Sequence, residues 1–119
     1  DKVLVQVASI MNNHCGHGDY LARFGGEEFA ILISGRTTND VARFAQELVD
    51  SCAAHDFSDG EENIGQVTIS IGLHLLDRES GGDLETSFRL ADKALYDAKR
   101  AGRNRIRFAS PNKPELIAA

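Results

Sequence analysis

Cysteine is scarce in this chain, because only two of its 119 residues, Cys15 and Cys52, are cysteine. Two cysteines are too few for a disulfide framework, and they fit a reducing cytosol. Long apolar runs are also missing, so no segment is predicted to cross a membrane. No signal-peptide pattern opens the chain. We therefore expect a cytoplasmic domain that makes no membrane contact of its own, although the whole protein can still carry a membrane anchor.

Positive charge is in deficit as well. The 13 lysines and arginines are outnumbered by 18 aspartates and glutamates, which gives a formal net charge of -5 and a pI near 5.3. This balance argues against binding to the nucleic-acid backbone. A chain of this length is expected to bury between about 60% and 70% of its unfolded surface, which is enough for one core.

Histidine and cysteine do not form a metal-site pattern. His14, Cys15 and His17 lie close together, and His55 follows much later. A structural zinc site needs a second pair of ligands at suitable spacing, which the sequence lacks. We therefore interpret residues 14–17 as a helix end followed by a loop, with zinc as the less favoured alternative.

Two glycines and two glutamates, from Gly25 to Glu28, stand between apolar runs. The flanking residues 20–24 and 29–33 are rich in aromatic and branched side chains, which predicts strands. Gly-Gly favours a two-residue hairpin turn, because glycine accepts positive φ without a Cβ penalty. Carboxylates at such a tip can bind a hard divalent cation that holds nucleotide phosphates. For these four residues alone, an ordinary turn with solvated glutamates is the commoner interpretation.

The rest of the chain predicts alternating helices and strands. Thr38 is a plausible N-cap of the second helix, and Gly102 is a C-cap glycine after the third. Arg105 and Arg107 alternate with apolar residues in the last strand and are expected to face solvent. The predicted elements are helices over 1–13, 38–54 and 84–101 and strands over 20–24, 29–33, 67–76 and 106–108, the third strand being partly buried on both faces.

Three stretches carry a family resemblance. Residues 23–29, Arg-Phe-Gly-Gly-Glu-Glu-Phe, resemble the signature of the GGDEF family of diguanylate cyclases in its common GGEEF form. Residues 67–72, Val-Thr-Ile-Ser-Ile-Gly, are similar to the central strand of that family. Residues 91–104, which include Ala-Asp-Lys-Ala-Leu-Tyr-Asp-Ala-Lys and Gly-Arg-Asn, are similar to its carboxy-terminal motif. The order of the matches makes a chance resemblance an unlikely explanation.

The resemblance implies an α+β fold, ferredoxin-like, as in the palm of nucleotide cyclases, with an antiparallel sheet and helices. Residues 1–109 would form the carboxy-terminal two-thirds of the GGDEF catalytic domain, and residues 110–119 a tail. The first strand of the family, with a metal-binding aspartate, and a helix with a guanine-reading asparagine would precede Asp1. Without that central strand, the hairpin and the 67–76 strand would each keep an unpaired edge. We therefore expect the 119 residues alone to be inactive.

The implied activity is the condensation of two GTP molecules into cyclic di-GMP with release of pyrophosphate, within a bacterial signalling protein that has a sensory or regulatory domain. The implied cofactor is Mg²⁺ or Mn²⁺, and catalysis needs a homodimer in which each domain holds one GTP. Glu27 matches the metal ligand and can assist deprotonation of the 3′-hydroxyl. Glu28 matches a catalytic position of less defined role, and Gly25 and Gly26 let the backbone approach the nucleotide.

Three further residues match substrate contacts of the family. Asp1 matches an aspartate on the guanine edge, and its ordinary interpretation is an acid at a helix start. Lys99 and Arg103 match contacts to the β- and γ-phosphates. Cations at a helix C-terminus also gain about 0.3 to 1 kcal/mol from the helix dipole, so phosphate binding is preferred only because the surrounding motif matches.

One departure concerns product inhibition. Many family members carry an Arg-x-x-Asp inhibitory site shortly before the signature, and here the corresponding residues are Gly16-His17-Gly18-Asp19. Asp19 remains, but Gly16 replaces the arginine, so product binding there is expected to be weak or absent. Two alternatives stay open: a catalytically silent GGDEF domain that binds nucleotide or dimerises, and a cyclase that makes a different cyclic nucleotide.

Overall fold

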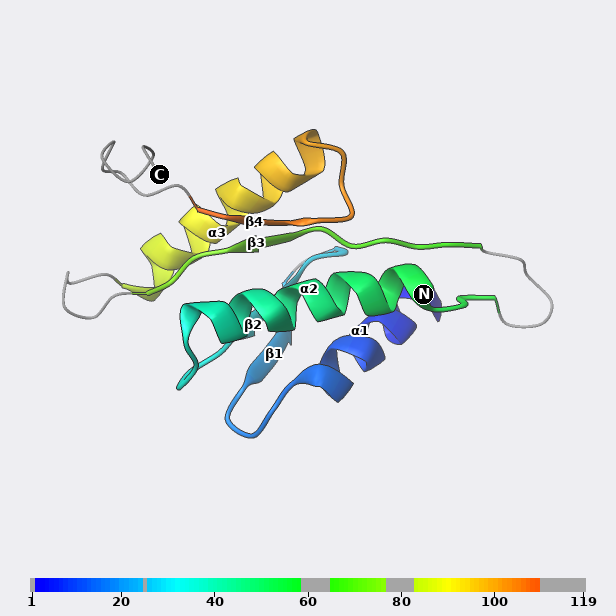
Figure 1. Cartoon of the computed structure of the whole chain (residues 1–119), viewed down its shortest axis with the longest axis horizontal. Helices are drawn as coiled ribbons and strands as arrows, with labels where there is room; N and C mark the ends of the chain where they lie inside the picture. Colours follow the sequence, from blue (N-terminus) through cyan, green and yellow to red (C-terminus); the bar gives the residue numbers. More distant parts are fainter. Residues whose placement is uncertain (1, 25, 59–64, 77–82, 110–119) are drawn as a thin grey trace. The chain divides into compact units, whose positions relative to one another are not determined.

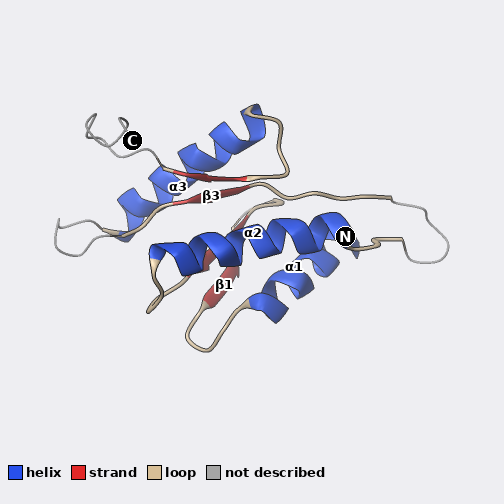
Figure 2. Ribbon diagram, in the orientation of Figure 1, coloured by secondary structure: helices blue, strands red, loops and turns tan. Residues whose placement is uncertain are grey.

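The computed structural model describes residues 2–24, 26–58, 65–76 and 83–109, and Figure 1 shows their elements along the chain. The described residues belong to two compact units, Asp1–Ile69 and Ser70–Ala119, which are treated separately below. In chain order the elements are α1 (Lys2–His14), β1 (Tyr20–Arg23), β2 (Phe29–Leu32), α2 (Thr38–Ala54), β3 (Ile71–Leu73), α3 (Leu84–Arg100) and β4 (Ile106–Phe108). Figure 2 distinguishes the helices from the strands. None of the described helices is both long and apolar enough to span a membrane.

In the first unit, α1 packs against α2. The predicted helix over 38–54 is confirmed, but its N-cap is Thr37 instead of Thr38. The Thr37 hydroxyl accepts a hydrogen bond from the backbone N–H of Asp40 at 3.1 Å, which satisfies a donor that the helix itself leaves unpaired. Apolar side chains from both helices and the segment after α2 form the core, namely Val7, Met11, Phe44, Ala45, Leu48, Val49, Cys52 and Phe57.

Polar side chains also connect the two helices. His14, the last residue of α1, places Nδ1 2.8 Å from the carbonyl oxygen of Ile10 and Nε2 3.2 Å from the hydroxyl of Ser51 on α2. Beyond the end of α2, Nε2 of His55 lies 2.9 Å from Oε1 of Gln6 on α1. A carbonyl oxygen only accepts, so in neutral His14 the Nδ1–H donates and Nε2 accepts from Ser51. The predicted helix end at residue 14 is therefore confirmed, and both histidines have partners within the fold.

The hairpin of β1 and β2 is antiparallel, with Tyr20 opposite Leu32 and Arg23 opposite Phe29. Its strands are each one residue shorter than predicted. β1 and β2 pair only with each other in the described part of the chain, as do β3 and β4. Each of the two sheets therefore has two strands in the described part of the chain.

In the second unit, β3 runs parallel to β4, with Ile71 opposite Ile106 and Leu73 opposite Phe108. The predicted length of the strand over 67–76 is wrong, because it contains only three ladder residues, and this pair is parallel, unlike the antiparallel hairpin. The shortening follows from its partner, which offers only three residues for pairing. The direction follows from the connection, since a helix between two strands returns the chain to the same end of the sheet. The expected partial burial of β3 is confirmed at all three residues.

The helix α3 packs closely on β3. Its buried positions are the small residues Ser87, Ala94 and Ala98. A Cβ atom on Gly72 of β3 would lie 2.1 Å from the Ala91 carbonyl oxygen and 2.2 Å from the Leu95 nitrogen. Glycine is therefore required at position 72 because the strand backbone lies directly on the helix backbone.

Both ends of α3 are capped by residues that sequence rules identify. The carboxylate of Asp83 accepts a hydrogen bond from the Thr86 N–H at 2.7 Å, and this bond lowers the pKa of Asp83. At the other end, Gly102 has a φ of +124°. The N–H of Gly102 donates to the Lys99 carbonyl at 3.4 Å, and the N–H of Arg103 donates to the Ala98 carbonyl at 3.0 Å. This pair of bonds is a Schellman motif, which confirms Gly102 as the terminating glycine.

Candidate active site

The signature turn joins β1 to β2 through a loop that is wider than the two-residue turn that Gly-Gly favours. The N–H of Phe24 donates to the carbonyl of Glu28 at 2.7 Å, so the two bonded residues are four positions apart in the sequence. The side chain of Arg23 braces it, because Nε and Nη2 donate to the carbonyl of Gly26 at 3.0 and 2.6 Å. Gly26 has a φ of +33°, and a Cβ placed on it would meet nothing within 4 Å. Gly25 lies outside the described residues.

Glu27 and Glu28 are both exposed at this turn. Carboxylates in this position supply hard oxygen ligands, which Mg²⁺ prefers. Across the described residues, no group of three histidine, cysteine, aspartate or glutamate side chains could hold a metal ion. The turn therefore presents two carboxylates, which is a partial set of ligands.

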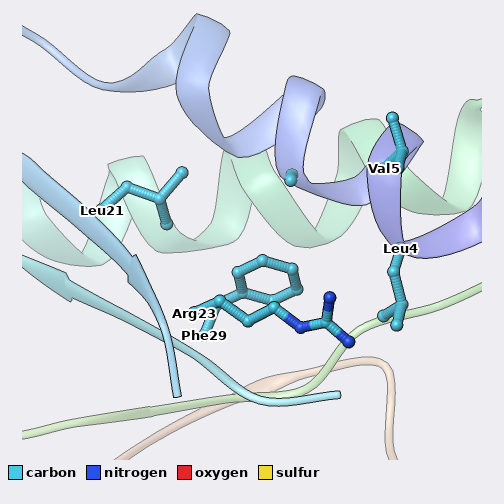
Figure 3. A pocket seen from close by; sticks show the side chains of 6 residues that line it. Leu4, Val5, Leu21, Arg23 and Phe29 are labelled. Atoms are coloured by element: carbon cyan, nitrogen blue, oxygen red, sulfur yellow. The ribbon is translucent and has the colours of Figure 1, made fainter. Parts of the chain in front are cut away.

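An apolar pocket of about 300 Å³ lies between α1 and the hairpin. Figure 3 shows Arg23 and Phe29 reaching from the hairpin, with the Arg23 guanidinium directed toward Leu4 of α1. Arg23 both lines the pocket and binds the Gly26 carbonyl, so the pocket adjoins the signature turn. The lining residues are Leu4, Val5, Ala8, Leu21, Arg23 and Phe29.

The second unit carries the two cations that match phosphate contacts. Lys99 lies in the last turn of α3 and is half-buried, whereas Arg103 is exposed just beyond the Schellman motif with a φ of +62°. Arg107 is exposed as expected. The expectation for Arg105 is wrong, because its side chain is half-buried and its Nε donates to the Arg103 carbonyl at 2.9 Å. This bond fixes the backbone that carries Arg103.

The family model for the diguanylate cyclase GGDEF domain matches residues 1–105, which is most of the chain. The chain belongs to the GGDEF family. It is 36% identical over 109 residues to diguanylate cyclase DgcP of Pseudomonas aeruginosa, covering 92% of this chain and 16% of that protein. It is 33% identical over 117 residues to diguanylate cyclase A of Treponema denticola, covering 97% of this chain and 30% of that protein. The chain thus spans less than a third of the length of either relative.

Solved GGDEF structures share the fold. The GGDEF domain of DgcB from Caulobacter crescentus, solved in complex with c-di-GMP, matches with a TM-score of 0.83 and 30% identity over 90% of this chain and 63% of that one. The active GGEEF domain of a diguanylate cyclase from Vibrio cholerae matches with a TM-score of 0.80 and 27% identity over 94% of this chain and 69% of that one. These matches confirm the α+β cyclase fold that the sequence predicts.

The segment Gly16–Asp19, for which the resemblance implies a position equivalent to the family's inhibitory site, contains a contact that the sequence does not predict. Nη2 of Arg36, which lies between β2 and α2, is 2.5 Å from Oδ2 of Asp19. The same oxygen accepts a hydrogen bond from the Gly16 N–H at 2.7 Å. Asp19 therefore has an arginine partner from outside the Gly16–Asp19 tetrad, and weak product binding at this segment stays a prediction. A Cβ on Gly16 would lie 2.7 Å from Nη2 of Arg36, so this arginine occupies the space beside the glycine.

The cysteine beside this pair is an ordinary thiol. Cys15 is half-buried, and desolvation raises its pKa, with a further increase from the negative charge of Asp19 and an opposing decrease from Arg36. Burial likewise raises the pKa of Cys52 in the core. Because the thiolate is the reactive form, neither cysteine is suited to act as a nucleophile at neutral pH.

The two units divide the predicted site residues of this GGDEF domain. Glu27, Glu28 and Gly26 lie together at the hairpin turn of the first unit, whereas Lys99 and Arg103 lie at the end of α3 in the second. Asp1 lies outside the described residues and directly precedes α1. Arg23 belongs to the signature and lies two residues before Gly25, but the sequence alone indicates no role for it. The pocket was not predicted, because most of its residues are ordinary apolar positions when they are considered one at a time.

Proposed function

We propose that this chain is the carboxy-terminal part of a diguanylate cyclase domain, which condenses two GTP molecules into cyclic di-GMP and releases pyrophosphate. The observation that carries the proposal is the signature turn, where Glu27 and Glu28 are exposed and the adjoining pocket is lined by the N-terminal half of α1. The names of the relatives support the same reaction. The activity belongs to a homodimer within a longer signalling protein, whose sensory or regulatory domain controls it.

The chain's own residues would act mainly by positioning charge. Glu27 is proposed to hold Mg²⁺ or Mn²⁺ and to assist removal of the 3′-hydroxyl proton, and Glu28 to contribute a second carboxylate. Such an ion, when bound, neutralises the triphosphate and lowers the pKa of the attacking hydroxyl. Two carboxylates fit the donor chemistry of these ions but do not complete a site, so triphosphate oxygens and an upstream aspartate are needed as well. Arg23 would keep the turn in place through its two bonds to the Gly26 carbonyl.

We place the guanine base against the pocket. In the sequence, Asp1 stands three and four residues before Leu4 and Val5, which line the pocket. A carboxylate that accepts from both N1–H and the exocyclic amine favours guanine over adenine, which lacks that donor pair. A volume of about 300 Å³ is at the small end of ligand pockets, which suits a base more than a whole nucleotide.

The test is the variant Glu27→Gln, measured by cyclic di-GMP formation from Mg·GTP in the protein that carries this chain together with its upstream segment. The amide keeps the shape but loses the charge that binds the cation. A metal supplies several kcal/mol of transition-state stabilisation, so losing about 3 kcal/mol would reduce the rate about 100-fold. Glu47→Gln is the matched control, because Glu47 is an exposed glutamate on α2 in the same unit.

Two outcomes would contradict the proposal in different ways. A Glu27→Gln variant that keeps the full rate would remove Glu27 from the metal site. An unsubstituted protein that binds GTP but forms no cyclic product would instead support the silent GGDEF domain, for which the partial set of carboxylates in the described residues is the favouring observation.

A further inference from the structure

An ion pair closes the end of the hairpin that lies opposite the signature turn. Asp19 directly precedes β1, and Arg36 follows β2 by four residues and directly precedes Thr37, the N-cap of α2. The contact of 2.5 Å between Nη2 of Arg36 and Oδ2 of Asp19 therefore joins the entry of the hairpin to its exit and to the start of α2.

This pair is built into the first unit. The side chain of Asp19 is only 2% exposed and that of Arg36 is 26% exposed, so both charges are largely removed from water. The Gly16 N–H gives the carboxylate a second donor at 2.7 Å. The guanidinium carbon of Arg36 lies 4.9 Å from the centroid of the Phe44 ring, which belongs to the core of α2. A planar guanidinium can bind a carboxylate and stack on an aromatic ring at once, which a lysine cannot do.

The hairpin needs such an anchor. Its ladder has only four residue pairs. An isolated two-stranded hairpin is marginally stable in water. A slip of one residue would turn Leu21 and Phe29 away from the pocket that they line, because side chains alternate between the two faces of a strand.

We propose that Arg36 is a positioning residue, which fixes the base of the hairpin against α2 and so holds Glu27 and Glu28 at a defined place. The turn itself is braced by Arg23, which leaves the opposite end to the pair of Arg36 and Asp19. The anchoring of the hairpin depends only on the fold of this chain. Its consequence for catalysis rests on the proposed cyclase function.

The first experiment measures amide hydrogen exchange of the 119-residue chain. In Arg36→Met, which keeps an apolar stem over Phe44, exchange at hairpin amides such as that of Phe24 should become at least about tenfold faster, while α1 amides change less than about twofold. Arg43→Met is the matched control, because Arg43 is on α2 with a side chain that is 71% exposed and only a 3.7 Å contact to Asp40. Its hairpin exchange should stay unchanged.

Two results of this experiment would overturn the proposal. One is that the exchange rates of the hairpin amides stay unchanged in Arg36→Met. The other is an equal loss of protection in the hairpin and in α1, which would mean that the pair stabilises the unit without fixing the hairpin. If Arg36→Met does not fold, Asp19→Asn decides the matter, because it keeps the shape and the acceptor but removes the charge, and it should loosen the same hairpin amides.

The second experiment measures GTP turnover in the protein that carries the chain. Arg36→Met should lower kcat by about tenfold or more with less than about a twofold change in KM, and Arg36→Lys should recover part of kcat because it restores the charge. The double variant with Asp19→Asn should be no worse than Arg36→Met alone, since both remove one interaction. Strictly additive decreases in kcat, or a change that is confined to KM, would overturn the role of Arg36 in catalysis. An inactive unsubstituted protein would refute the cyclase proposal while the exchange experiment still tests the anchor.

Discussion

The substitution Gly72→Ala is expected to destabilise the second unit strongly. The φ of Gly72 is not positive, so alanine fits the backbone conformation, and only space forbids it. The new methyl group would lie 2.1 Å from the Ala91 carbonyl oxygen, 2.2 Å from the Leu95 nitrogen and 2.8 Å from the Leu95 Cα. All three are backbone atoms of α3, and none can move away by a simple change of rotamer.

The size of the effect follows from these distances. Ordinary contact begins at 3.4 Å, so α3 and β3 would have to separate by more than 1 Å along the line to the carbonyl. Overpacking a core costs about 1 to 3 kcal/mol when side chains can adjust, so a clash with backbone is expected to cost about 3 kcal/mol or more. At about 4 °C per kcal/mol for a domain of this size, the melting temperature should fall by about 12 °C.

Thermal unfolding followed by circular dichroism measures this change. Gly16→Ala is the comparison, because its methyl group would meet side-chain atoms alone, with Nη2 of Arg36 at 2.7 Å and Oδ2 of Asp19 at 3.5 Å. The loss of stability in Gly16→Ala should be smaller than in Gly72→Ala, because side-chain atoms can shift where a helix backbone cannot. If Gly72→Ala melts within about 3 °C of the unsubstituted chain, the close packing of β3 on α3 is refuted.

Three further predictions concern binding, feedback and pH. Lys99→Ala combined with Arg103→Ala should weaken GTP binding about tenfold by calorimetry while Arg107→Ala does not, and equal affinities in all variants would refute phosphate binding by this pair. Cyclic di-GMP should not inhibit strongly through the segment containing Gly16; submicromolar noncompetitive inhibition that Gly16→Arg leaves unchanged would contradict this. The bond to the Thr86 N–H lowers the pKa of Asp83, so its stabilisation is complete above the ordinary aspartate pKa and is lost as the pH falls through the lower folded value. The cap in Asp83→Asn does not titrate, so between about pH 5 and about pH 2 the melting temperature of this variant should fall less than that of the unsubstituted chain. An equal fall in both proteins would refute a stabilising cap at Asp83.

Local rules predicted most of the elements. The helices over 38–54 and 84–101 were found within a residue because apolar spacing and capping residues act over a few positions, as the Schellman motif at Gly102 shows. The strand over 67–76 was overestimated because a strand's length depends on its partner. That partner, β4, offers three residues and lies more than thirty residues further along the chain.

The residues of the candidate site likewise differ in how well the sequence predicts them. The hairpin at the signature was predicted because its residues are contiguous, although its loop is wider than predicted, and the roles of Glu27 and Glu28 stay predictions. The pair of Asp19 and Arg36 was not predicted, because its residues are 17 positions apart and meet only when the hairpin and α2 are folded. Asp19 was instead interpreted from its neighbour Gly16, which contributes a backbone N–H and the space that Arg36 fills.

The backbone that follows α3 carries a conformational strain. Arg103 and Asn104 have φ values of +62° and +51°, in the left-handed region. Asparagine tolerates that region, but for arginine it costs about 1 kcal/mol or more relative to glycine. Stability alone would favour glycine at position 103. The arginine therefore stands at this position at a cost in folding free energy, and such local strain is common at functional sites, as the proposed phosphate contact of Arg103 requires.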